Sequence, residues 1–287
     1  MHVPDPPAGR SAQGVGRTGQ PAERVQAWQP AVPGVAEVLH ARFVRHVYPA
    51  HTHDAWTLLV VEHGAIRFDL ERAEHGAVAA RVTVLPPQVA HTGRAGTAAG
   101  FRKQVLYLDD SVLGAELVGA AVGGPGLTDP LLRRRVGELH RVLAASGEEL
   151  EAESRLALIR SRLHEHLLGR QPEPLGPSGS GLARQLRELL DSRTGDPLTL
   201  REAGATLHAH PDALVRAFTA AFGLPPHRYV IGRRVDAARR LLLAGQPLAE
   251  VAAVTGFHDQ SHLTRHFTRQ IGTTPGRYAR GGPARPE

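Results

Sequence analysis

The sequence predicts a two-domain α+β protein: an antiparallel β-barrel or sandwich with trailing helices, followed by an all-α domain. Its 287 residues are enough for about two domains, each with a core of its own. Short β-forming runs separated by Gly, Pro, His and Asp turns occupy residues 35–109. From Ser111 onward the apolar residues recur at steps of three and four, which is typical of amphipathic helices.

Composition sets the predicted domain boundaries. Residues 1–25 are predicted to be a disordered tail, because Met1–Gln20 is rich in Pro, Gly and Arg and lacks the apolar stretch of a signal peptide. Residues 171–181 are predicted to be a linker, since their Pro and Gly residues sustain neither helix nor strand. The two domains are therefore expected at residues 26–170 and 182–287.

Composition also excludes several classes of protein. A hydrophobic content of 41% is ordinary for a globular chain, so disorder throughout is excluded. No run approaches the roughly 18 apolar residues of a membrane span, so no membrane partner is expected. The absence of Cys excludes disulfides and thiolate metal sites. Without an export signal, the expected location is the cytoplasm.

The net charge of +6 lies entirely in the C-terminal part of the chain. From Gly181 onward there are 15 Arg against 9 Asp and Glu, whereas residues 1–180 carry 19 basic and 19 acidic residues, Lys103 being the single lysine. Genomic base composition is an alternative cause of the number of Arg residues, but it does not explain their uneven distribution. A basic domain beside a neutral one predicts a polyanionic partner for the basic domain.

Two amphipathic helices are predicted at residues 129–145 and 149–168. Each has one apolar stripe, formed by Leu132, Val136, Leu139 and Leu143 in the first and by Leu156, Ile159, Leu163 and Leu167 in the second. Such stripes pack on the barrel, on each other or on a second subunit, and these alternatives stay open. We expect a homodimer through these helices, because exposed apolar stripes associate with partners.

The clearest local pattern is a helix-turn-helix unit near the C-terminus. Leu248–Thr255 predicts a short helix with Val251 and Val254 directed inward, and Gly256 is placed to end it in a left-handed conformation. Asp259 is then placed to cap a second helix by accepting hydrogen bonds from its free N–H groups.

The second helix of this unit has one apolar and one polar side. Leu263, Phe267 and Ile271 fall at steps of four, and the residues predicted to face outward are Gln260, Ser261, Thr264, Arg265 and Thr268. Gln and Arg form bidentate hydrogen bonds with base edges in the major groove, so this face is predicted to bind DNA. The alternative is an ordinary solvated helix face, which the absence of acidic residues beyond the cap and the helix–turn–helix spacing disfavour.

A similar unit is predicted upstream. Leu198–Thr206 forms a short helix, and Pro211 begins another at a position where its missing N–H is not needed. The outer face of that helix is predicted to carry Asp212, Arg216 and Thr219. Between the two units, residues 229–243 predict a connecting helix.

Four segments carry a resemblance to a known family. They are Leu-Pro-Pro-His-Arg-Tyr (224–229), Arg-Arg-Val-Asp-Ala-Ala-Arg-Arg-Leu-Leu (233–242), Gly-Phe-His-Asp-Gln-Ser-His-Leu-Thr-Arg-His-Phe (256–267) and Thr-Pro-Gly-Arg-Tyr (274–278). Nearly all of residues 182–280 resembles the AraC/XylS family of transcription regulators. The resemblance implies two helix-turn-helix subdomains on one connecting helix, bound to successive major grooves of double-stranded DNA. It places base contacts at Arg216 in the first unit and at Gln260, Ser261, His262 and Arg265 in the second.

The chain departs from the family pattern in the first unit. Ala203-Gly204 stands where the family usually has Leu-Ala, and His210 stands where a Ser usually caps the second helix. Gly costs about 1 kcal/mol relative to Ala inside a helix, and the loss of a Leu side chain removes packing. We therefore expect a softer first unit, with sequence specificity carried mostly by the second.

The N-terminal domain resembles, more loosely, the cupin-like sensor domain of the same family. The similar segments are His51-Thr-His53-Asp54, Val60-Val-Glu-His-Gly64, Pro86-Pro-Gln-Val-Ala-His91-Thr-Gly93 and Leu106-Tyr-Leu-Asp109. The resemblance implies a barrel whose mouth brings His51, His53 and His91 together. Residues expected to line an effector pocket are Arg42, His51, His53, Trp56, His91 and Tyr107, with Trp56 and Tyr107 equally suited to the core, which is slightly favoured for Trp56.

No metal or other cofactor is predicted for this domain. Metal-binding cupins place a Glu five residues after the second His, and Leu58 occupies that position here. If a metal binds at all, its ligands are expected to be His51, His53 and His91. A polar pocket and plain structural histidines are the alternatives.

These observations favour a DNA-binding transcription regulator of the AraC/XylS type, modulated by a small-molecule effector in the barrel. RNA polymerase is a further candidate partner. The alternatives are a metal-dependent cupin enzyme fused to a DNA-binding domain, and a regulator whose barrel only dimerises. The chain has no Cys nucleophile and no Gly-rich phosphate loop, so it is not expected to be an enzyme.

Overall fold

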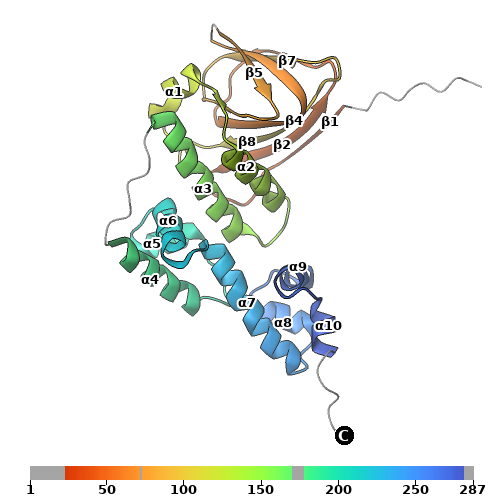
Figure 1. Ribbon diagram of the computed structural model, residues 1–287, viewed down its shortest axis with the longest axis vertical. Helices are drawn as coiled ribbons and strands as arrows, with labels where there is room; N and C mark the ends of the chain where they lie inside the picture. The colour runs from red at the N-terminus through yellow and green to blue at the C-terminus, as the bar shows by residue number, and fades with distance from the viewer. Residues whose placement is uncertain (1–22, 72, 170–177, 281–287) are drawn as a thin grey trace, which may run out of the picture.

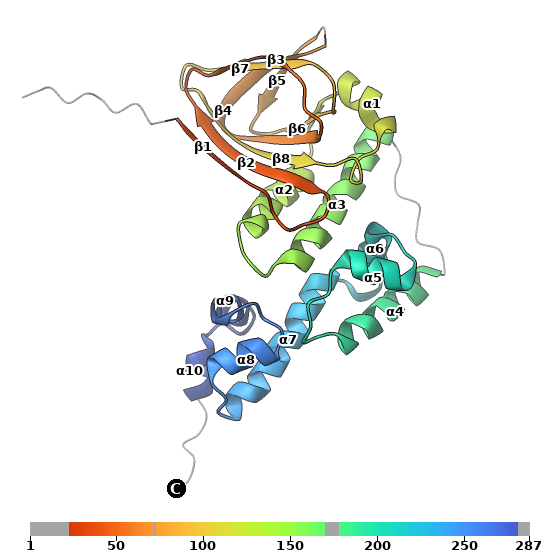
Figure 2. The ribbon, with the colours of Figure 1, turned by 180° about the vertical axis from the view of Figure 1, so that it is seen from behind.

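The computed structural model describes residues 23–71, 73–169 and 178–280. A β-barrel with helices on one side lies next to a purely helical domain (Figures 1 and 2), so the predicted α+β architecture is confirmed. The strands of the described residues are β1 (Arg24–Trp28), β2 (Val35–Phe43), β3 (Val47–His51), β4 (Trp56–Leu70), β5 (Ala73–Val78), β6 (Val82–Leu85), β7 (His91–Ala95), β8 (Phe101–Leu108) and β9 (Gly126–Leu127). β1 begins at Arg24, so it includes the last two residues of the predicted N-terminal tail, and residues 1–22 of that tail lie outside the described residues.

Strand β4 joins the two sheets of the barrel. Its first half pairs with β8 and β6, in the order β1-β2-β8-β4-β6-β9, and its second half pairs with β5 and β7. All of these pairings are antiparallel. At the crossover Gly64 has φ +74°, and a Cβ there would lie 2.0 Å from the carbonyl oxygen of Gly100. Only glycine allows the strands to approach so closely at this bend.

The barrel has a core on each face of its larger sheet. Leu58 and Val60 belong to a cluster that the helices cover, whereas Leu59 and Val61 belong to a separate cluster inside the barrel. Successive side chains of a strand point to opposite faces, so a strand buried on both sides needs a continuous apolar run. The run Trp56–Val61 meets this requirement.

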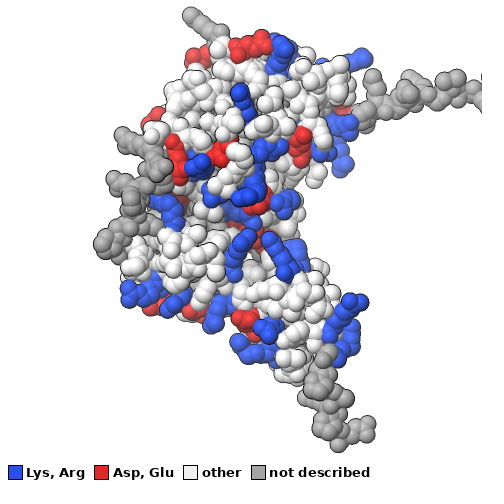
Figure 3. Space-filling model, viewed as in Figure 1, with Lys and Arg blue, Asp and Glu red and all other residues white. Residues whose placement is uncertain are grey.

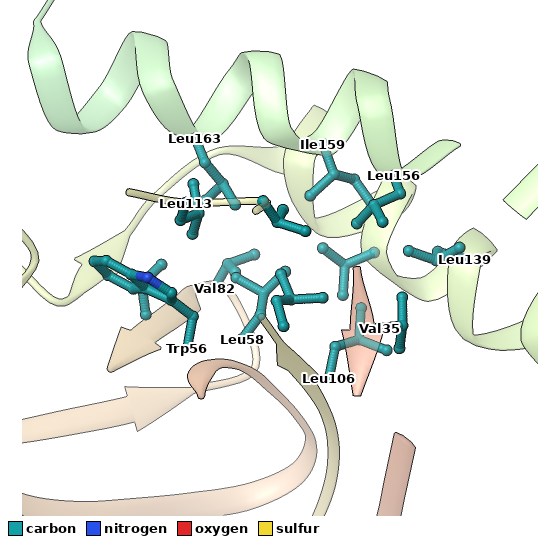
Figure 4. Close-up of a cluster of buried hydrophobic side chains, with 14 of the residues drawn as sticks. Val35, Trp56, Leu58, Val82, Leu106, Leu113, Leu139, Leu156, Ile159 and Leu163 are labelled. Carbon is teal, nitrogen blue, oxygen red and sulfur yellow. The ribbon is translucent and has the colours of Figure 1, made fainter. Parts of the chain in front are cut away.

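Helices α2 (Pro130–Leu143) and α3 (Glu149–Leu168) cover the outer face of this sheet. Figure 4 shows Leu156, Ile159 and Leu163 of α3 directed at the strands, and the stripe of α2 is buried in the same cluster. Both predicted stripes are therefore satisfied within the chain. The prediction of a homodimer rested on exposed stripes, and neither helix has one because both stripes are buried on the sheet. The homodimer itself stays a prediction. A short 3₁₀ turn, η1 (Ala115–Leu117), and helix α1 (Val118–Gly123) precede them.

The helical domain contains two helix-turn-helix units joined by a long helix. Its helices are α4 (Ser178–Ser192), α5 (Leu200–Leu207), α6 (Pro211–Phe222), α7 (Pro226–Leu243), α8 (Leu248–Val254), α9 (Gln260–Ile271) and α10 (Pro275–Arg280). Each unit has its own apolar cluster, centred on Phe218 in the first and on Phe267 in the second. The predicted linker at 171–181 extends too far, because residues 178–181 form the first turn of α4 despite two glycines. The remainder of the linker lies outside the described residues.

None of the helices described in this chain combines the length and apolar character needed to cross a membrane.

Candidate nucleic-acid interface and sensor pocket

The first helix-turn-helix unit is well capped at its first helix. The Thr199 hydroxyl accepts a hydrogen bond from the Glu202 N–H at 3.1 Å, and the Glu202 carboxylate accepts one from the Thr199 N–H at 2.9 Å. This reciprocal capping box satisfies two N–H groups that would otherwise lack partners. It stabilises the start of α5, and the prediction of a less stable first unit did not take this capping box into account.

The glycine of the first unit has a structural role. A Cβ at Gly204 would lie 2.6 Å from the carbonyl oxygen of Ala209, so only glycine lets α5 approach the chain that enters α6. Gly204 is therefore required by the turn, whatever its cost in helix propensity. His210 caps α6 through a longer bond, with its Nδ1 3.3 Å from the Asp212 N–H nitrogen, as expected for a weaker cap.

The outer face of α6 is not open to solvent. Asp212 is 8% exposed and forms an ion pair with Arg160 of α3 at 2.6 Å. Arg216 and Thr219 are half-buried, and each has one buried polar atom, Nε and Oγ1, without a hydrogen-bond partner among the described residues. Of the three residues predicted to face DNA, Asp212 is therefore covered by α3, and Arg216 and Thr219 are partly buried. The local sequence does not predict the contact of Asp212, because the covering helix belongs to the other domain.

The second unit has the predicted turn and cap. Gly256 has φ +79°, and a Cβ there would lie 2.6 Å from the carbonyl oxygen of Gly195. Asp259 caps α9 by accepting from the His262 N–H at 2.6 Å. Val254, predicted to face inward, is 66% exposed, because α8 ends there and Phe257 fills the core of the unit.

The outer face of α9 is open in part. Gln260, Ser261 and Arg265 are exposed and Thr264 is half-buried, and their DNA contacts stay a prediction. His262, expected from the family resemblance to contact bases, is only 2% exposed. Its Nδ1 lies 3.2 Å from the His258 N–H nitrogen, and its Nε2 faces Glu148 of the barrel domain at 3.6 Å.

Figure 3 shows arginine side chains spread over the helical domain on one face of the molecule.

The barrel encloses a pocket of about 90 Å³. Four of the predicted effector residues line it: His51, His53, His91 and Tyr107. Their rings lie close together, with centroids 4.5 Å apart for His51 and His91 and 5.0 Å apart for His53 and His91. The volume suits a ligand of only a few heavy atoms, since a water molecule occupies about 30 Å³ in the liquid.

Two other predicted lining residues lie outside this pocket. Arg42 is exposed, on the opposite side of β2 from the pocket residue Leu39. Trp56 is fully buried in the cluster between sheet and helices, so it is a core residue. Both assignments to the pocket are wrong because strand residues alternate between faces, and the sequence did not show which face lines the pocket.

The hydrogen bonds of two histidines fix their tautomers. His51 Nδ1 lies 2.7 Å from the carbonyl oxygen of Pro49, and His91 Nδ1 lies 3.0 Å from that of Val89. A carbonyl oxygen only accepts hydrogen bonds, so Nδ1 carries a proton in both rings and Nε2 is the nitrogen left to contact a ligand. Burial, together with the neighbouring His91, lowers the pKa of His53 to about 4, so the His53 ring is neutral near pH 7.

Lys103 is the main pocket residue that the sequence analysis missed. It is 8% exposed, and burial lowers the pKa of its ammonium group to about 8. Its Nζ lies 4.4 Å from the ring centroid of Tyr48, and no carboxylate or hydrogen-bond acceptor pairs with it among the described residues. A signal was present in the sequence, because the single lysine of the chain alternates with Val105 and Tyr107 along β8.

The three histidines fit a transition metal through their ring nitrogens. Their ligand atoms all lie within 4.8 Å of one another, and the Nδ1–H bonds of His51 and His91 to carbonyl oxygens are the outer-shell contacts that metal-binding histidines usually make. Leu58, at the position of the missing Glu, faces the helices and supplies no fourth ligand. The residues therefore offer three neutral nitrogen ligands.

Comparison with known proteins agrees with both domains. Residues 33–159 match the model of the AraC-like ligand-binding domain, and residues 204–281 match that of a helix-turn-helix domain. LumQ of Photobacterium leiognathi, named as a probable transcriptional regulator, is 40% identical over 62 residues, which are 21% of this chain and 25% of LumQ. YbfI of Bacillus subtilis strain 168, an uncharacterized helix-turn-helix-type transcriptional regulator, is 28% identical over 131 residues, 44% of this chain and 46% of YbfI.

The matched segments therefore span less than half the length of these relatives. Among solved structures, the AraC-like transcriptional activator CuxR aligns with 75% of this chain and 86% of its own at 15% identity, with a TM-score of 0.39.

Proposed function

We propose that this chain is controlled by a small anionic molecule bound inside the barrel. Both of its domains match models of AraC-type DNA-binding regulators. The observation that carries the proposal is the buried ammonium group of Lys103 in the pocket. A buried charge without a partner is costly, and an anionic ligand would neutralise it. Tyr48 and the neutral histidines supply ring surface and hydrogen-bonding groups beside it. A small carboxylate suits both the charge and the volume.

Short-chain carboxylates are expected to stabilise the barrel, and their primary amides, which lack the charge, are not. A ligand at 100 times its Kd stabilises the folded state by about 2.7 kcal/mol, and this is measurable as a rise in Tm. Lys103→Met is expected to abolish the rise. Because the pKa of Lys103 is about 8, binding is expected to weaken as the pH rises through that value and the ammonium group loses its proton. Equal responses to carboxylates and amides would exclude an anionic effector.

A transition-metal ion is a second candidate for the same pocket, favoured by the tautomers of His51 and His91. Equilibrium dialysis against Co²⁺, followed by its visible absorption, is expected to show one ion per chain. His91→Gln is expected to remove it, whereas His63→Gln, at an exposed position, leaves it bound. A protein that emerges from dialysis without Co²⁺ would exclude the metal and with it a metal-dependent cupin enzyme.

A further inference from the structure

Helix α3 is buried on two sides. Leu156, Ile159 and Leu163 face the barrel. On another side Ala157 forms a small apolar cluster with Leu200 and Val215 of the first helix-turn-helix unit, all of them buried. Figures 1 and 2 both show α3 beginning near α7 and passing beside α6. The same helix thus packs on the sheet of the barrel domain and on the first unit of the helical domain.

The turn before α3 contacts the other recognition helix. The Glu148 carboxylate, 8% exposed, lies 2.6 Å from Arg265 Nη2 and 2.7 Å from His266 Nε2, both through Oε1. Its Oε2 lies 3.6 Å from His262 Nε2. Burial acts to raise the pKa of Glu148, but the neighbouring rings of His262 and His266 hold it well below its usual range, so the group is a carboxylate. One acidic side chain of the barrel domain therefore forms hydrogen bonds with two residues of α9 and faces a third.

The fit at this turn is close. Gly147 has φ +78°, and a Cβ there would lie 2.4 Å from His258 Cβ and 2.8 Å from His262 Nδ1. No other residue would let the turn approach the start of α9 without displacement.

Polar contacts also attach α3 to the first unit. Arg160 forms the ion pair with Asp212 and lies 2.9 Å from the ring nitrogens of His210. The Glu153 carboxylate accepts from the Leu200 N–H at 2.5 Å, at the start of α5. Both units are thus held at the faces predicted to meet DNA.

We propose that α3 and the Gly147–Glu148 turn form an autoinhibitory latch that holds the recognition helices away from DNA. This inference rests on the proposed function, because it assigns the covered faces to DNA. The major groove is about 12 Å wide and admits one helix, so α6 cannot enter it with α3 packed on the same face. Glu148 occupies Nη2 of Arg265, a donor that base edges or phosphates would otherwise take. DNA binding therefore requires the latch to open, and a state that opens more easily binds DNA more tightly.

The test compares matched variants of the full-length chain. Glu148→Gln removes the charge that holds α9, and Arg265, whose side chain is 48% exposed, stays solvated after release. Glu149→Gln is the control, because it makes the same change at the next residue, which is exposed. Arg160→Gln tests the first unit independently, with the exposed Arg141→Gln as its control.

Fluorescence anisotropy measures binding to a random-sequence duplex and to the fragment that each protein enriches from a randomised pool. We expect Glu148→Gln and Arg160→Gln each to bind about tenfold more tightly than the unmodified chain, and both controls to stay within about twofold.

A second measurement follows the opening itself. The chain has no cysteine, so labels attach only to cysteines introduced in place of two exposed residues, Val78 on β5 and Val254 on α8. The distance between the labels is expected to lengthen in Glu148→Gln and to stay unchanged in Glu149→Gln. Unchanged affinity together with an unchanged distance would overturn the latch. If no variant binds DNA, the proposed function fails, and the label distance still decides whether Glu148 holds the domains together.

Discussion

Replacing Arg265 with Ala is expected to lower the affinity of the chain for its selected DNA fragment by about tenfold to 100-fold. Arg265 lies on the exposed side of α9, and a bidentate contact between Arg and a base edge contributes about 1–3 kcal/mol of discrimination. The same substitution also removes the bond to Glu148, which favours release of α9. The loss is therefore expected to be larger in the Glu148→Gln background, where only the DNA contact is removed.

Anisotropy titrations at one fixed salt concentration measure this effect, because salt alone changes DNA affinity by orders of magnitude. Arg269→Ala, at the exposed end of α9, is the control for loss of positive charge. Arg216→Ala is expected to lower the affinity by less than Arg265→Ala does, since specificity is assigned mostly to the second unit. Equal losses for Arg265→Ala and Arg216→Ala would refute that ranking of the two units.

Replacing Ile159 with Ala is expected to destabilise the barrel domain by about 2–5 kcal/mol. Ile159 is fully buried between α3 and the sheet, and its truncation leaves a cavity that the surrounding strands fill only in part (Figure 4). The chain has two tryptophans, Trp28 and Trp56, and both lie in this domain. Their fluorescence in a urea titration therefore reports the unfolding of the barrel domain.

Leu168→Ala serves as the comparison for Ile159→Ala. Leu168 lies on the same helix but is 44% exposed, so its truncation is expected to cost less than about 1 kcal/mol. Similar losses for both variants would mean that α3 is not packed on the sheet as described.

Much of the fold follows from local patterns. The stripe of α3 has helical spacing, and the helix forms where that spacing predicts it. Gly256 and Asp259 predicted a turn and a cap, and both are present, because each acts on backbone groups a few residues away. Patterns of this kind need no knowledge of the rest of the chain.

What the sequence did not predict depends on contacts between distant residues. Glu148 and Arg265 are separated by 117 positions, and neither residue type nor spacing links them. The errors in the predicted pocket lining have a different cause. Arg42 was assigned to the pocket and Lys103 was overlooked because the sequence does not show which face of a strand lines the pocket. A shift of one residue exchanges the two faces of a strand.

The double burial of α3 has a consequence for how a signal travels through the molecule. Leu59 lines the pocket while its neighbour Leu58 packs in the helix-covered core, and Ile159 lies in that core while its neighbour Arg160 holds the first recognition helix. The helix-covered core thus lies between the pocket and the face of α6 that is predicted to bind DNA. A displacement of β4 by a fraction of an ångström would act on α3 directly, since close-packed interiors transmit strain.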